Sequence, residues 1–179
     1  MGDVLVHRKT RRLANNGEAP SGSCGKNCCI CRILYREEAK IKGPNKLQCT
    51  YDRTIGCRSS NIIYGIWCRI CQMVVYVGET GGIMYQRIQN HLSSIRCKRP
   101  GMEVAKHFND EGHALEDVRV IGLEKVYKNW LAYRRAREQR WMGLLGTHQY
   151  AGGLNRKQEC PAAQHLTGAR RSRPSVGRF

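Results

Sequence analysis

Two cysteines placed between two short β-type segments constrain this sequence more than any other feature. Asn61–Cys68 (NIIYGIWC) and Met73–Gly78 (MVVYVG) are rich in β-branched and aromatic residues, as strands are. The connection between them holds Cys68 and Cys71, so we expect an antiparallel hairpin with both thiols at its turn. A C-x2-C spacing lets two thiolates reach one tetrahedral ion.

Two histidines further along the chain complete a ligand set of the zinc type. His107 and His113 follow the cysteine pair, and we predict that they join Cys68 and Cys71 at a structural zinc ion. Their spacing in HFNDEGH lies at the upper limit of zinc-finger spacing. The alternative is a pair of buried thiols and two surface imidazoles, and the spacing alone leaves it open.

The rest of the central region alternates between helical and strand-like patterns. Apolar residues recur with helical spacing in Gly82–Arg96, a shorter helix is expected at Val104–Phe108, and Asp117–Val126 resembles a strand. The strongest helix is Asn129–Leu145, before Gly146. Its expected apolar face consists of Leu131, Trp141, Met142 and Leu145. The order β-β-α-β-α predicts an α/β fold, with a three-stranded antiparallel sheet flanked by helices over residues 61–155.

A cysteine-rich extension, residues 24–60, precedes this region. It has too few apolar residues for a core of its own, and Lys40–Lys46 is expected to be a polar linker. A second zinc site is a natural use of its thiols. The ligand choice is ambiguous because Cys29 and Cys49 also lie here, and a disordered reduced linker is the alternative. The predicted ligands are Cys24, Cys28, Cys31 and Cys57.

The charge of the chain points to a polyanionic partner. The 179 residues include 31 Lys and Arg against 14 Asp and Glu, a formal net charge of +17. Residues 1–23 and 156–179 are expected to be basic and disordered. We expect them to bind the phosphate backbone of DNA, or of RNA. No long apolar run or apolar N-terminal stretch occurs, so we expect an intracellular, nuclear protein without membrane insertion.

Several polar residues in the central region carry chemistry that suits a functional site. Glu138 falls on the apolar face of the last helix, where it either pairs with a base such as Arg134 or holds a cation. Arg87 and His91 lie one turn apart, which suits phosphate recognition and proton transfer but also a solvated polar edge. With Tyr64 and Tyr76 on the paired strands, these residues favour metal-assisted phosphodiester hydrolysis.

The same positions resemble the motifs of the GIY-YIG nucleases. Ile62-Ile63-Tyr64 stands in the place of GIY and Tyr76-Val77-Gly78 in that of YIG. Arg87, His91, Glu138 and Asn155 follow in the family's order. The phrase YVGETGG and the C-x2-C between the motifs resemble the endonuclease of Penelope-like retroelements, over about residues 24–155. The first motif has isoleucine for glycine, and no reverse transcriptase accompanies the domain on this chain.

This resemblance implies a DNA endonuclease that nicks through one divalent ion, Mg2+ or Mn2+, bound by Glu138. It implies that Tyr64 is a general base or orients the attacking water, and that Tyr76 orders water or phosphate. Arg87 would stabilise phosphoryl charge, His91 would assist proton transfer, and Asn155 would brace the site. The alternative functions are an inactive, zinc-containing nucleic-acid-binding module and a basic protein of membrane surfaces or chaperone type.

Overall fold

A computed structural model describes residue 24 and residues 27–127 and 130–156. Of the basic segments expected to be disordered, residues 1–23 and 156–179, only Arg156 lies within these described residues. Within the described part, no helix combines the length and the apolar character needed to cross a membrane.

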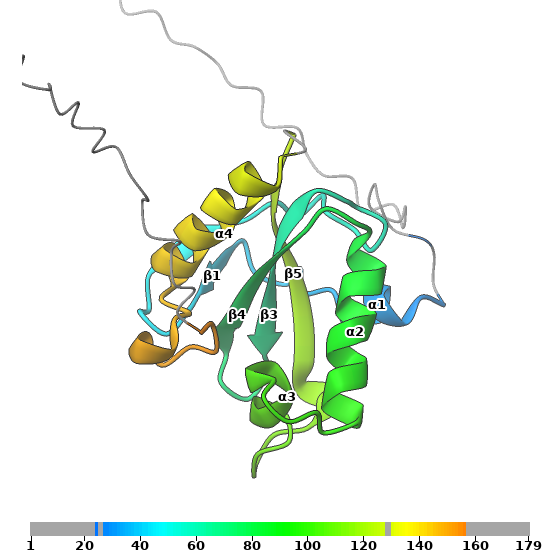
Figure 1. Ribbon diagram of the computed structural model, residues 1–179, viewed down its shortest axis with the longest axis vertical. Helices are drawn as coiled ribbons and strands as arrows, with labels where there is room; N and C mark the ends of the chain where they lie inside the picture. Colours follow the sequence, from blue (N-terminus) through cyan, green and yellow to red (C-terminus); the bar gives the residue numbers. More distant parts are fainter. Residues whose placement is uncertain (1–23, 25–26, 128–129, 157–179) are drawn as a thin grey trace, which may run out of the picture.

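The predicted three-stranded antiparallel sheet is present. It consists of β3 (Ile62–Cys68), β4 (Met73–Thr80) and β5 (Val118–Lys125), in the order β4-β3-β5 (Figure 1). Every residue of β3 is buried, because this strand has a neighbour on each side and is covered on both faces. The predicted hairpin therefore forms between the central strand and an edge strand, β4.

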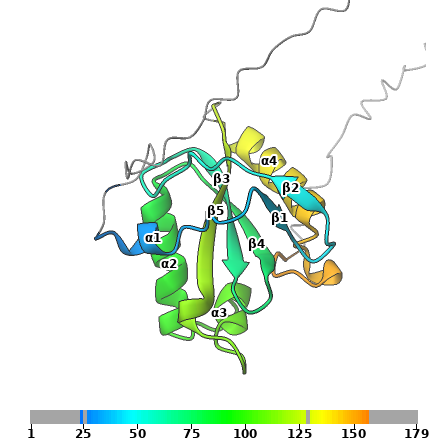
Figure 2. The same cartoon turned by 180° about the vertical axis from the view of Figure 1, so that it is seen from behind.

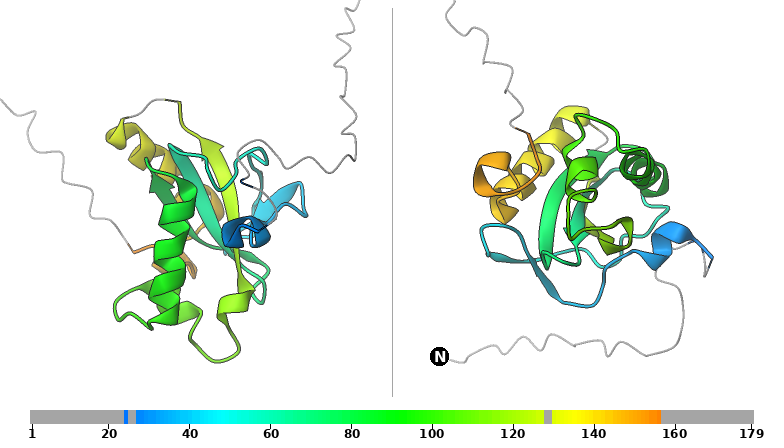
Figure 3. Two further views of the ribbon diagram at one scale, coloured as in Figure 1. Left: turned by 90° about the vertical axis from the view of Figure 1, so that its right-hand side faces the viewer. Right: turned by 90° about the horizontal axis from the view of Figure 1, so that it is seen from below.

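Helices cover the two faces of the sheet. The helices α2 (Met84–Arg96) and α3 (Glu103–His107) pack on one face, and α4 (Leu131–Leu145) lies across the other side of β4 (Figures 1 and 3). Alternate residues of β3 divide between the two core clusters, as strand geometry requires. The short 3-10 helices η1 (Leu115–Asp117) and η2 (Gln149–Ala151) complete the described elements.

The cysteine-rich extension packs against the same sheet. It forms α1 (Cys29–Arg32), β1 (Lys40–Lys42) and β2 (Gln48–Thr50), and the two strands pair as a separate hairpin (Figure 2). The prediction of a linker over residues 40–46 is therefore wrong for the residues in β1. Ile41 is 2% exposed and anchors β1 to the core formed with α4, and three-residue strands are too short to show a sequence period.

The extension also caps the beginning of α2. The first N–H groups of a helix have no partner inside the helix. Here the Met84 N–H donates to the carbonyl of Ser59 at 2.9 Å, and the Tyr85 N–H donates to that of Cys57 at 2.8 Å. The segment that carries the last cysteine of the extension thus fixes the start of α2, the helix that bears Arg87 and His91.

The apolar face predicted for the last helix is only partly correct. Trp141, Met142 and Leu145 are buried, whereas Leu131 is 45% exposed. The buried positions of the first turns of α4 are instead held by the polar residues Arg134 and Glu138. This end of the helix meets the polar edge of β4 rather than the apolar surface of the sheet.

Candidate active site and metal-binding groups

One buried hydroxyl joins three of the predicted site residues. Tyr64, on β3, is fully buried, and its Oη accepts a hydrogen bond from Nε of Arg87 at 2.9 Å. The same oxygen lies 2.8 Å from Nε2 of His91. Arg87 and His91 are one turn apart on α2, so a single oxygen from the sheet fixes both side chains. Tyr76 completes the group, with its ring centroid 5.4 Å from that of His91.

Gly78 makes room for the Tyr64 ring. The two residues are paired across β3 and β4, and a Cβ on Gly78 would lie 2.5 Å from the Tyr64 Oη and 2.6 Å from its Cζ. It would also lie 3.0 Å from Cε1 of Tyr76. The third residue of the second motif is therefore restricted to glycine by the tyrosine of the first.

The outer edge of β4 places Asn155 and Glu138. Asn155 binds the Val77 backbone twice: its Oδ1 accepts from the Val77 N–H at 2.9 Å, and its Nδ2 donates to the Val77 carbonyl at 2.7 Å. Two residues along the strand, the Glu79 N–H donates to Oε1 of Glu138 at 3.1 Å. The outward-facing groups of an edge strand need such partners. The two side chains thereby occupy successive positions about 7 Å apart along the strand.

Arg134 pairs with the carboxylate of Glu79 and not with that of Glu138. Its Nε lies 2.8 Å from Oε2 of Glu79, and its Nη1 donates to Oδ1 of Asn61 at 3.2 Å. Among the described residues no ion pair involves Glu138, so the first alternative, a pair with a base such as Arg134, is not the one the structure shows. Arg134 lies one turn before Glu138 on α4, but the Glu79 carboxylate on β4 is its partner. That leaves the second alternative, a carboxylate that faces a cavity.

The surroundings of Glu138 favour its protonated form. Burial, and next the nearby Glu79 carboxylate, raise the pKa of Glu138 to about 7. The Glu79 N–H and the Arg87 guanidinium act in the opposite direction but do not cancel the effect. Since a bound cation would lower this pKa, the site accommodates an ionised Glu138 best when a positive charge is next to it.

His91 and Tyr64 are both held neutral. Burial, and then the Arg87 charge, lower the pKa of His91 to about 4. Burial likewise raises the pKa of Tyr64 well above its ordinary value. Because Arg87 donates to the Tyr64 oxygen, the phenol proton is available for Nε2 of a neutral His91.

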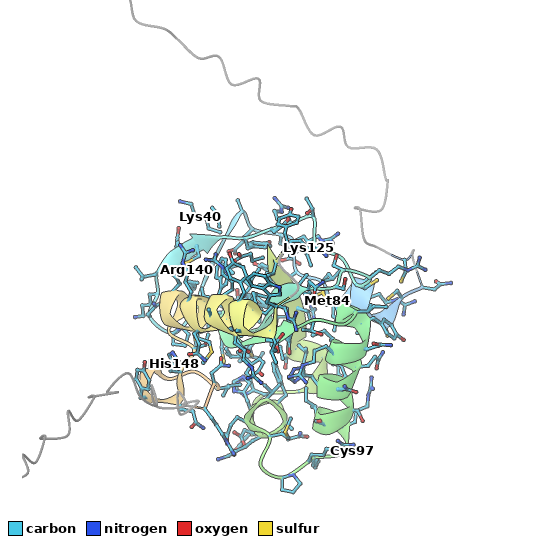
Figure 4. All side chains as sticks on the ribbon, turned by 45° about the horizontal axis from the view of Figure 1, so that its top comes forward. Lys40, Met84, Cys97, Lys125, Arg140 and His148 are labelled. Carbon is cyan, nitrogen blue, oxygen red and sulfur yellow. The ribbon has the colours of Figure 1, made fainter. Side chains whose placement is uncertain are left out.

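A cavity of about 230 Å³ brings most of the predicted site together. It lies between α2, whose ends are marked by Met84 and Cys97 in Figure 4, and α4, which leads to the loop with His148. Tyr64 lies behind its wall. The lining residues with polar chemistry are Tyr76, Arg87, His91, Glu103, Glu138, Asn155 and Arg156. Five of the six predicted catalytic residues therefore share one cavity, and the sixth binds two of them.

The predicted Cys2His2 set also converges. The ligand atoms of Cys68, Cys71, His107 and His113 lie within 4.8 Å of one another. The Cys71 Sγ is 3.3 Å from Nε2 of His113 and 3.8 Å from that of His107. Neighbouring ligands of a tetrahedral zinc ion lie about 3.3–3.8 Å apart, so the geometry is compatible with structural zinc. The group joins the β3–β4 turn to the end of α3.

The predicted four-cysteine set is equally compact. The sulfur atoms of Cys24, Cys28, Cys31 and Cys57 lie within 4.8 Å of one another. Cys57 is fully buried, and its Sγ is 3.2 Å from that of Cys24 and 3.4 Å from that of Cys31. Burial raises the pKa of the Cys57 thiol, so at neutral pH this sulfur stays protonated unless a cation takes the place of its proton. Cys29 and Cys49 do not belong to the group.

Three charged residues near the site were not predicted from the sequence. Glu79 binds Arg134, and Glu103 and Arg156 line the cavity. Strand alternation places Glu79 on the same face of β4 as Val77, but it does not indicate the contact with Arg134, which comes from α4. Glu103 and Arg156 carry no comparable signal, since their proximity depends on how α3 and the loop after α4 pack.

Comparison of the chain with protein-family models, with curated proteins and with solved structures finds no match.

Proposed function

We propose that this protein is a metal-dependent DNA endonuclease of the GIY-YIG type, similar to the endonuclease of Penelope-like retroelements. The observation that carries the proposal is the hydrogen-bonded group Arg87–Tyr64–His91, which adjoins a cavity that also contains Glu138. Together, this group and the cavity offer a fixed guanidinium, a neutral imidazole and the carboxylate of Glu138. Phosphodiester hydrolysis requires these three functions: charge stabilisation, proton transfer and a cation ligand.

Glu138 and Arg87 act on the phosphate. Glu138 is the residue that would hold Mg2+ or Mn2+, and the ion would supply Lewis-acid stabilisation of the phosphoryl oxygens. The Glu138 carboxylate is itself held by the Glu79 N–H, which donates to Oε1. Arg87 stabilises the charge that grows on the same oxygens, and its Nε bond to Tyr64 keeps the guanidinium in place before the substrate binds.

The tyrosines and His91 manage water and protons. Because Tyr64 is fully buried, we assign it the orienting role, in which its hydroxyl holds Arg87 and His91. Tyr76 lines the cavity and therefore orders the attacking water or the phosphate. His91 would assist proton transfer while its Nε2 is held at the Tyr64 hydroxyl. Asn155 braces the site through its two bonds to Val77 and takes no part in proton transfer.

The two cysteine groups have structural roles in this proposal. The Cys2His2 group holds α3, which forms part of the cavity wall, and the four-cysteine group holds the segment that caps α2. Both sets consist of four protein ligands, which leaves no open position for catalysis. The same two groups also fit an inactive, zinc-containing nucleic-acid-binding module, so the functions must be separated by an assay.

A plasmid-nicking assay makes that separation. Zinc-loaded protein should convert supercoiled plasmid to the open circular form when Mg2+ or Mn2+ is added, and Glu138→Gln should bind DNA but not nick it. Glu37→Gln, an exposed carboxylate outside the cavity, is the matched control and should retain activity. Binding without nicking by the wild type would favour the inactive module. DNA affinity that does not fall steeply with salt would instead favour a membrane-surface or chaperone-type protein.

A further inference from the structure

A second arginine lines the cavity from the side formed by α3 and the loop after α4. Arg156 and Glu103 both border the cavity, and they form an ion pair across its rim. The Arg156 Nη2 lies 2.8 Å from Oε1 of Glu103, and Nε lies 3.3 Å from the same oxygen. Two N–H groups of one guanidinium edge are thus directed at a single carboxylate oxygen.

The ion pair with Glu103 does not satisfy the full hydrogen-bonding capacity of the Arg156 guanidinium. An arginine edge matches two oxygens of a carboxylate or phosphate in parallel, whereas here one oxygen receives both bonds. The Arg156 side chain is 61% exposed, and exposed ion pairs contribute little to stability. A phosphate that offers two oxygens would therefore displace Glu103 at small cost.

The backbone that carries Arg156 is fixed although its side chain is exposed. Asn155, the preceding residue, is bound to Val77 by its side chain, and its N–H donates to the Thr147 carbonyl at 2.8 Å. The Leu154 N–H donates to the Val75 carbonyl at 2.9 Å. Arg156 thus begins from a rigid point on the edge of β4, next to the residue that braces the candidate active site.

We propose that Arg156 forms a second phosphate-binding site at the rim of the cavity, and that Glu103 occupies it until DNA binds. The site would take a backbone phosphate of the strand whose neighbouring phosphate lies at Arg87. This inference rests on the proposed function, because it assumes that DNA enters this cavity. It assigns Arg156 to DNA binding and not to the chemical step.

Duplex binding by zinc-loaded protein, measured by fluorescence anisotropy without Mg2+ or Mn2+, tests the inference. Arg156→Ala should weaken binding roughly three- to tenfold and reduce the slope of log affinity against log salt by about 0.9. Arg69→Ala is the matched control: its side chain is 58% exposed, pairs with a single carboxylate and does not line the cavity. It should change both quantities much less.

A double-mutant cycle tests the role of Glu103. Glu103→Gln should strengthen binding more than Glu37→Gln does, and this excess should vanish in the Arg156→Ala background. Equal effects of Arg156→Ala and Arg69→Ala, or weaker binding by Glu103→Gln, would overturn the inference. Because binding is measured without nicking, a wild type that binds but does not cut refutes only the nuclease. If the wild type cuts DNA and Arg156→Ala binds the duplex as tightly as the wild type does, only the rim site is refuted.

Discussion

The hydroxyl of Tyr64 lies 2.8 Å from Nε2 of His91, and this contact links the centre of the sheet to the helix that faces the cavity. The same oxygen accepts from Arg87, so the phenol has a guanidinium on one side and an imidazole on the other. Neither helical side chain could be held this way by its own helix. The arrangement depends on a fully buried tyrosine at a central strand.

Tyr64→Phe should separate the hydroxyl from the ring that fills the core. The substitution keeps the aromatic volume but leaves the Arg87 Nε–H and the His91 nitrogen without their shared partner. We expect a loss of about 1–3 kcal/mol in the free energy of unfolding, measured by urea denaturation, and roughly a hundredfold fall in nicking rate. Tyr150→Phe, at an 80% exposed position, should change neither. Full activity in Tyr64→Phe would contradict the orienting role.

His91 should make the fold sensitive to acid. Its pKa is about 4 in the folded protein and 6.5 when exposed, so the unfolded chain binds more protons in between. Stability should therefore fall as the pH drops below 6.5, by about 2 kcal/mol at pH 5, and the loss should be complete below pH 4. Denaturation curves of wild type and His91→Gln, both zinc-loaded, should converge as the pH is lowered. Parallel pH profiles would show that His91 is not buried in its neutral form.

When no Mg2+ or Mn2+ is bound, ionised Glu138 should lower the stability of the zinc-loaded fold at neutral and higher pH. Its pKa is raised from 4.5 to about 7, so the folded protein binds more protons than the unfolded chain between these values. Stability therefore falls as the pH rises through this interval. At pH 8, Glu138→Gln should be more stable than wild type by on the order of 2–3 kcal/mol while it fails to nick DNA. A destabilised Glu138→Gln would indicate a purely structural carboxylate.

The sequence predicted the sheet from its β-branched and aromatic segments, and α2 from its helical period. The apolar stripe at Met84, Ile88 and Leu92 identifies α2, and all three residues are buried. The residues of the candidate site came from outside this pattern. Glu138 stands out because a carboxylate on an apolar face is out of place. The chemistry of Tyr64, Tyr76, Arg87 and His91 suits phosphodiester hydrolysis, and only Asn155 depends on the order of the resembling motifs.

What the sequence did not predict depends on contacts between distant segments. The partner of Arg134 could not be read from helix spacing, because Glu79 reaches it from β4 over 55 residues of sequence. The strand β1 was missed because only Ile41, one residue of three, is buried. In the same way, Arg156 meets Glu103 only after α3 and the loop after α4 have packed next to each other at the rim of the cavity.

Metal content should distinguish the two cysteine groups. Wild-type protein should carry two zinc ions per chain, and Cys57→Ser and Cys71→Ser should each lose one, because each replaces a ligand of a different four-residue group. Elemental analysis together with thermal unfolding measures both the loss and its effect on stability. Cys97→Ser, at an exposed position outside both groups, should keep two ions. One ion in the wild type would confine zinc to one group, and none would refute both assignments.

Gly78→Ala should damage the site without removing any functional group. The new Cβ would lie 2.5 Å from the Tyr64 Oη and 2.6 Å from Cζ, closer than nonbonded atoms come, so the buried ring must move. Since the same hydroxyl holds Arg87 and His91, both should lose their fixed positions. We expect about 1–3 kcal/mol of destabilisation and a fall in nicking rate that exceeds the fall in DNA affinity.

Gly82→Ala provides the matched control for this prediction. A Cβ there meets no atom closer than 3.8 Å, so the same chemical change should leave stability and nicking near the wild-type values. Restoration of Gly78→Ala by Tyr64→Phe would be incomplete, because the Cζ contact remains after the hydroxyl is removed. If Gly78→Ala and Gly82→Ala behaved alike, the Tyr64 ring would not require glycine at position 78. The close approach of Tyr64 to Gly78 across β3 and β4 would then be refuted.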